Sequence, residues 1–95
     1  MAISRYAFIN NTEVNVSGFI YRAVEDDLLS YETHISVEGK RLDQYAYEFY
    51  GDSNDWWLIA AASGIGWWLQ IPGGILLKIP NDTNQIQSFI DNLEN

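Results

Sequence analysis

Apolar and polar residues recur in two different periods along this chain, and the changes of period divide it into elements. Residues 33–37 follow a period of two, with Ile35 and Val37 on one face and an exposed His34 on the other. This alternation is typical of a strand. A second strand is predicted over residues 75–79, where an apolar run stops at a proline.

A helix is predicted between these strands, over residues 42–50. Its apolar side chains recur at helical spacing and form one stripe that faces a core. The stripe consists of Leu42, Tyr45, Ala46 and Phe49. Gly51 follows directly, and a glycine there can end a helix in the left-handed conformation.

A second helix is predicted over about residues 54–62, where Asp52 or Ser53 can cap its first turn. We expect Trp57 in the core and Trp56 half-exposed, because the two side chains lie on adjacent helix faces. The run of alanines at 60–62 indicates close approach to another element.

Both ends of the chain have weaker patterns. Residues 1–32 carry short β-prone runs separated by turn residues, which predicts an extended arm with one or two short strands. Such an arm could add a strand to a neighbour's sheet or pack on its own domain. Residues 81–95 predict a short amphipathic helix that docks on its own domain or on a partner; its apolar positions are Ile86, Phe89, Ile90 and Leu93.

Composition narrows the possible functions. The chain has 95 residues, which fits one domain, and it has no cysteine for disulfides or thiolate chemistry. Its net charge of −8 argues against binding nucleic acid through phosphates. No apolar run approaches the roughly 20 residues of a membrane span, and no secretory signal is visible at the N-terminus. The acidity serves solubility or complements a basic partner.

Aromatic residues make up 15% of the chain, more than one small core easily buries. Trp and Tyr are enriched at protein interfaces, so we expect part of this surface to contact partners. Trp67 and Trp68 are adjacent, and at least one of them should project outward; docking into a protein is favoured over sugar stacking or local packing. The predicted contact residues are Tyr6, Phe8, Phe19, Tyr21, Trp56, Trp67, Trp68, Phe89, Ile90 and Leu93.

No catalytic set can be assembled from these residues. His34 is the single histidine and has no partner at a suitable spacing. Asp52 and Asp55 could form a carboxylate pair, but helix capping explains both. The acidic cluster at 25–27 lacks the loop spacing of a calcium site. We therefore expect no enzyme activity, no metal and no cofactor.

Several of these positions resemble a LysM domain over residues 33–80. They are Val37, Gly39, Leu42, Ala46, Phe49, Trp57 and the closing run from Pro72 to Pro80. The phrases Tyr50–Asp52 and Trp56–Ala60 look closer to the LysM-like small tail and baseplate proteins of contractile-tailed bacteriophages, of the baseplate wedge or tail protein X type. Ser63 stands where a LysM domain usually has Asn.

The resemblance implies an α+β fold: a LysM-like βααβ core at 33–80, an extended N-terminal arm at 1–32 and a C-terminal helix at 81–95. In the phage branch it implies a structural protein of the virion tail baseplate, assembled in the host cytoplasm. Its partners would be hub, wedge, tube or sheath proteins, with several copies per assembly and with neither nucleic acid nor membrane. The alternative is a module that binds peptidoglycan or N-acetylglucosamine, with a groove formed by Gly39, Lys40, Arg41, Trp67 and Trp68.

Overall fold

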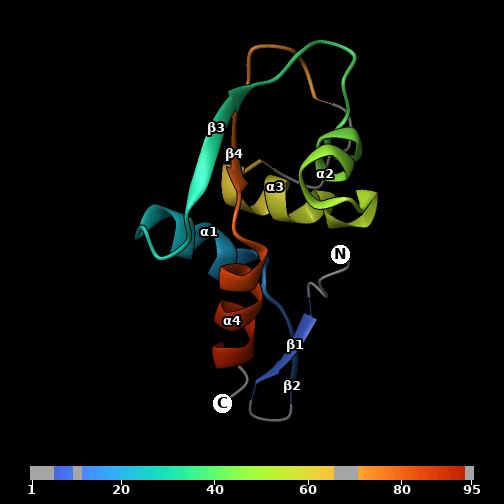
Figure 1. Cartoon of the computed structure of the whole chain (residues 1–95). Helices are drawn as coiled ribbons and strands as arrows, with labels where there is room; N and C mark the ends of the chain where they lie inside the picture. The colour runs from blue at the N-terminus through green and yellow to red at the C-terminus, as the bar shows by residue number, and fades with distance from the viewer. Residues whose placement is uncertain (1–5, 10–11, 66–70, 94–95) are drawn as a thin grey trace.

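The computed structural model describes residues 6–9, 12–65 and 71–93 and has an α+β fold. Its described part holds two separate two-stranded antiparallel sheets and four α-helices (Figure 1). The elements are β1 (Tyr6–Ile9), β2 (Thr12–Asn15), α1 (Ser17–Glu25), β3 (Tyr31–Ile35), α2 (Leu42–Tyr50), the 3₁₀ turn η1 (Ser53–Asp55), α3 (Trp56–Ser63), β4 (Leu76–Pro80) and α4 (Thr83–Leu93). None of these helices is long and apolar enough to cross a membrane.

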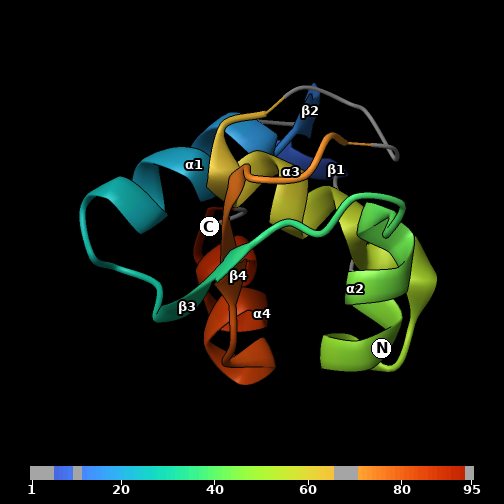
Figure 2. The same cartoon turned by 90° about the horizontal axis from the view of Figure 1, so that it is seen from above.

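The two predicted helices form where the sequence places them. α2 has the predicted bounds and ends at Gly51, whose φ of 75° is left-handed. The Asp52 carboxylate then accepts a hydrogen bond from the Asn54 N–H at 2.9 Å and starts η1, which leads into α3. Trp57 is buried and Trp56 is half-buried, as expected. Viewed from above, α1 and α2 flank α3 on opposite sides (Figure 2).

The predicted strand pair also forms, with β3 two residues earlier than predicted, at Tyr31–Ile35. The exposed and buried faces of β3 and the residues directly after it are the reverse of the prediction. Ile35 and Val37 are exposed, at 59% and 60%, whereas Ser36 is buried. His34, expected to be exposed, is half-buried with its ring 5.1 Å from that of Phe49. The register explains this, because His34 lies opposite the buried Leu77 and therefore faces the helices with it.

The extended conformation predicted for the end of the N-terminal arm is wrong. β1 and β2 form a hairpin, as the short runs suggested, but residues 17–25 are the helix α1. Val16, Ile20, Ala23 and Val24 are all buried in the core. Their spacing of i, i+4, i+7 and i+8 is helical, and this period over a longer window prevails over the β-prone run at 19–21.

The C-terminal helix docks on its own chain. The Asp82 carboxylate accepts a hydrogen bond from the Gln85 N–H at 3.1 Å and caps α4. Ile86 and Ile90 are buried, and Phe89 and Leu93 pack partly buried against the same core. This core joins side chains of α1, α2, α3, β4 and α4.

Candidate docking surface

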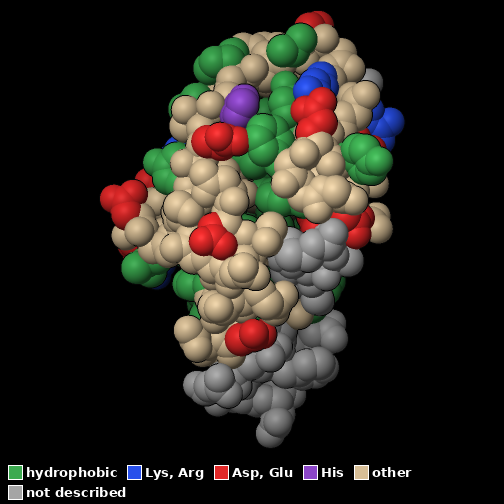
Figure 3. Space-filling view, in the orientation of Figure 1, with side chains coloured by type: hydrophobic (Ala, Val, Ile, Leu, Met, Phe, Trp, Pro, Cys, Tyr) green, Lys and Arg blue, Asp and Glu red, His purple; other side chains and the backbone are tan. Residues whose placement is uncertain are grey.

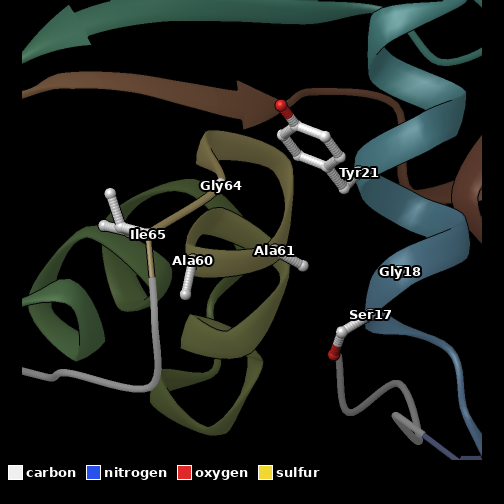
Figure 4. A pocket seen from close by; sticks show the side chains of 7 residues that line it. All are labelled: Ser17, Gly18, Tyr21, Ala60, Ala61, Gly64 and Ile65. Atoms are coloured by element: carbon white, nitrogen blue, oxygen red, sulfur yellow. The ribbon is translucent and has the colours of Figure 1, made fainter.

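A groove between α1 and α3, which we call the α1–α3 groove, is one of the hollows on the described surface. Its volume is about 330 Å³, and small side chains form most of its floor (Figure 4). It is lined by Ser17, Gly18, Tyr21, Ala60, Ala61, Gly64 and Ile65. The contact between α1 and α3 confirms the close approach expected from the run of alanines. Pockets of this size with apolar walls are typical of ligand or side-chain binding sites.

Gly64 and Tyr21 build one end of the groove together. Gly64 ends α3 with a left-handed φ of 70°, a conformation that glycine adopts at no steric cost. A Cβ at this position would lie 2.7 Å from Cε1 of Tyr21. The missing side chain therefore lets the Tyr21 ring lie against the end of α3 (Figure 4).

Two aromatic side chains extend this apolar surface onto α1. Phe19 is 39% exposed and Tyr21 is 44% exposed, although both are large and apolar enough for a core. A second hollow of about 450 Å³ lies beside them on α1. It is lined by Asn15, Gly18, Phe19, Tyr21, Arg22, Glu25 and Asp26. We call Phe19, Tyr21 and the α1–α3 groove the α1 docking surface.

The polar groups around this surface are mainly acidic. Glu25 accepts a hydrogen bond from the Lys78 ammonium at 3.1 Å, and this interaction raises the pKa of Lys78. Asp26 and Asp27 follow at the end of α1, where no described residue forms an ion pair with them. The Ser17 hydroxyl is buried at the groove without a hydrogen-bond partner in the described residues. The surface thus offers an apolar floor, the hydroxyls of Ser17 and Tyr21, and a rim where Asp26 and Asp27 outnumber Arg22.

The other predicted contact residues are spread over the molecule. Tyr6 on β1 is 45% exposed, and Trp56 on α3 is half-buried. Ile90 is covered by its own chain. The side chain of Phe8 lies outside the described part of the chain, as do Trp67 and Trp68. Contacts with partners through these residues stay predictions. Among the predicted contact residues whose side chains are described, Phe19 and Tyr21 come together at the α1 docking surface.

Of the two loops proposed to form a sugar groove, the structure describes Gly39, Lys40 and Arg41, while Trp67 and Trp68 lie outside the described residues. The Gly73 N–H donates a hydrogen bond to the Glu38 carboxylate at 2.7 Å, which joins the loop after β3 to the loop before β4. Lys40 forms an ion pair with Glu48 at 2.8 Å, and Arg41 forms one with Asp43 at 3.2 Å. Both cations are thus engaged with carboxylates of α2.

The side chains considered as catalytic candidates lie in different elements, His34 on β3 and the two aspartates at η1. His34 lies 3.5 Å from the Glu32 carboxylate, and both side chains are partly exposed on a strand. Asp52 caps η1, while Asp55 is buried at the start of α3. No group of three or more metal-ligating side chains occurs in residues 6–9, 12–65 and 71–93. The predicted absence of activity and cofactors nevertheless stays a prediction.

Sequence reasoning missed most of the groove, because its small residues carry no chemical signature. Neither Gly18 nor Gly64 is marked by the sequence as part of a binding surface. The helical spacing of Val16, Ile20, Ala23 and Val24 was the signal that could have placed a helix opposite α3. Apolar side chains also reach the surface elsewhere among acidic ones (Figure 3).

Comparison with family models, with curated proteins and with solved structures found no match.

Proposed function

We propose that this chain is a non-catalytic assembly protein that binds neighbouring proteins through the α1 docking surface. The observation that carries this proposal is the exposure of Phe19 and Tyr21 beside an apolar groove. Large apolar side chains next to a pocket mark protein contacts, because burying aromatic anchors supplies most of the binding energy at interfaces.

The surface also indicates the chemistry of its partner. An apolar side chain of the partner would fill the α1–α3 groove, and the Ser17 hydroxyl would bond a polar group next to it. Asp26 and Asp27 would face basic residues, in keeping with the net charge of −8. The partner is therefore a protein with an apolar anchor flanked by Lys or Arg.

For the biological setting we propose a structural component of a phage tail or baseplate, with several copies of the chain in each virion. The order β3, α2, α3, β4 and the antiparallel pairing of β3 with β4 support this setting. This is the arrangement expected of the LysM-like small tail and baseplate proteins that the sequence resembles. Partners would then be hub, wedge, tube or sheath proteins.

Purification of the native particle that contains this chain tests the proposal. We expect tail proteins to co-purify with the wild-type chain, and Phe19→Ala to reduce their recovery by roughly tenfold or more, as expected for loss of an aromatic anchor. Tyr47→Ala is the matched control, because Tyr47 is 67% exposed on α2, away from this surface. Equal recovery with Phe19→Ala, or equal loss with Tyr47→Ala, would contradict the proposal.

The second candidate is a module that binds peptidoglycan or another N-acetylglucosamine polymer. The contact between Gly73 and Glu38 favours it, because Glu38 is next to Gly39 of the predicted groove and the bond holds the loop after β3 against the turn that leads into β4. Binding of chitin oligomers, weakened by Lys40→Ala and not by Phe19→Ala, would support this candidate. Particle recovery without chitin binding would leave the assembly role as the function.

A further inference from the structure

The β3–β4 sheet has two outer edges, and the hydrogen bonds show which backbone groups each edge presents. Along an antiparallel pair, opposite residues alternate between bonded pairs and pairs whose N–H and C=O point outward. Asn81 donates to Ser30 and Ser36 donates to Ile75, which fixes the phase of the alternation. Thr33 and its partner Lys78 therefore form an outward-pointing pair.

The outer edge of β4 is closed at Lys78 and Pro80 by side chains from two helices. The Ser63 hydroxyl at the end of α3 accepts from the Lys78 N–H at 2.8 Å and lies 3.3 Å from the Lys78 carbonyl, to which it donates. The Tyr50 hydroxyl of α2 donates to the Pro80 carbonyl at 2.7 Å. Proline has no N–H, so both outward groups of Lys78 and the one outward group of Pro80 are bonded.

The outer edge of β3 has no such cover. By the same alternation, the N–H and C=O groups of Tyr31, Thr33 and Ile35 point away from β4. Among the described residues, none forms a hydrogen bond to these groups. β3 also runs along the margin of the molecule (Figure 1). An open edge of this kind is a template for another strand.

We propose that the occupant is a second copy of this chain, whose β3 pairs antiparallel with β3 about a two-fold axis at Thr33. The strand is complementary to itself in that register. Glu32 lies opposite the partner's His34, Tyr31 lies opposite the partner's Ile35, and Thr33 meets the partner's Thr33. Aromatic with β-branched side chains and threonine pairs are favourable cross-strand neighbours, and the Glu32 carboxylate can accept a hydrogen bond from an imidazole N–H of the partner's His34.

The backbone fits the same register. Thr33 would exchange both of its outward hydrogen bonds with the partner's Thr33, and Tyr31 would do so with the partner's Ile35. The new strand would also cover apolar surface, because Ile35 is 59% exposed and would lie beside the partner's Tyr31. The result is a continuous four-stranded sheet across two chains.

This inference is independent of the proposed function. The β3 edge belongs to the sheet, while the α1 docking surface is built from α1 and α3. Phe19→Ala should therefore leave self-association unchanged, and a substitution on the β3 edge should abolish it. The net charge of −8 on each copy opposes close approach, so the association is weak and is best measured at high protein concentration.

Sedimentation equilibrium of the full chain tests the proposal. We expect the wild type to form dimers as concentration rises, and Thr33→Lys to weaken dimerisation at least tenfold. Two lysines would then lie directly opposite each other, and like charges in that position are unfavourable. Asn84→Lys is the control for charge, because Asn84 is exposed on α4. A wild type that stays monomeric, or dimers that survive Thr33→Lys, would overturn the proposal.

Amide hydrogen exchange of the wild type gives a second measurement that needs no substitution. The amides of Tyr31, Thr33 and Ile35 should exchange more slowly as concentration rises. Those of Glu32 and His34, which already bond to β4, should not change. Exchange at Thr33 that is equally fast in dilute and concentrated protein would refute pairing through this edge.

Discussion

At the scale of single residues, side-chain hydroxyls form hydrogen bonds that join distant parts of the backbone. Ser36 donates to the Pro72 carbonyl at 2.7 Å and accepts from the Ile75 N–H at 2.8 Å. On the outer edge of β4, Ser63 bonds the backbone groups of Lys78 and Tyr50 donates to the Pro80 carbonyl. Each hydroxyl bonds backbone groups that the helices and strands leave unpaired, and an unpaired buried group is costly.

Removing the Tyr50 hydroxyl should therefore destabilise the protein. Tyr50→Phe leaves the buried Pro80 carbonyl without its donor, and we expect the free energy of unfolding to fall by about 1–3 kcal/mol. Urea unfolding at neutral pH measures this. Tyr47→Phe is the control, because Tyr47 is exposed on the same helix; an equal loss in the control would rule out the explanation.

The same pair of proteins should differ in their response to alkaline pH. Burial raises the pKa of Tyr50 above its ordinary value of 10.0, and the Asp55 and Glu32 carboxylates add to the shift. The folded state then keeps a proton that the unfolded state loses above pH 10.0. The contribution of Tyr50 to the free energy of unfolding is therefore fully present below that pH. Above it, this contribution falls by about 1.4 kcal/mol per pH unit.

We accordingly expect the stability gap between the wild type and Tyr50→Phe to narrow above this pH. Lys78, whose pKa is also raised, loses its contribution in the same alkaline range, but it is present in both proteins and cancels in the comparison. Unfolding curves collected across the alkaline range provide the measurement. Gaps that stay constant with pH would show that Tyr50 does not carry the effect.

Gly64 offers a test of how the α1 docking surface is built. Gly64→Ala places a Cβ against the Tyr21 ring and also forces alanine into a left-handed conformation. Gly51→Ala also forces alanine into a left-handed conformation, but it creates no steric clash, because nothing lies within 4 Å of that position. We expect Gly51→Ala to lose about 1 kcal/mol, and Gly64→Ala to lose more and to displace Tyr21. If the two variants lose equal stability in thermal unfolding, close contact between Gly64 and the Tyr21 ring would be contradicted.

At the scale of elements, the helix end at Ser63 governs one edge of the sheet. Ser63→Ala should cost about 1 kcal/mol and should speed hydrogen exchange at the Lys78 amide, which loses its acceptor. Ser88→Ala, exposed on α4, should do neither. An unchanged Lys78 amide in Ser63→Ala would mean that another group protects this edge.

The elements also show where sequence reasoning succeeds. α2 and α3 were predictable because their signals are local: an apolar stripe, a capping Asp52 and the glycines that end them. Which face of β3 is buried was not predictable, because it depends on pairing with Leu77 and Ile79, which are distant in the sequence. α1 was missed because the β-prone residues 19–21 concealed a longer helical period. The α1–α3 groove depends on α1 and was missed with it.

At the scale of the whole molecule, the sheet that brings the strands together also sets the order in which the fold can form. Ile35 and Leu76 are paired but separated by both central helices, so pairing must close a long stretch of chain. Loop closure costs entropy before such contacts repay it. We therefore expect the local helices to gain their contacts first and the sheet to complete late. The open edge of β3 would then form late as well, which would limit pairing between partly folded chains.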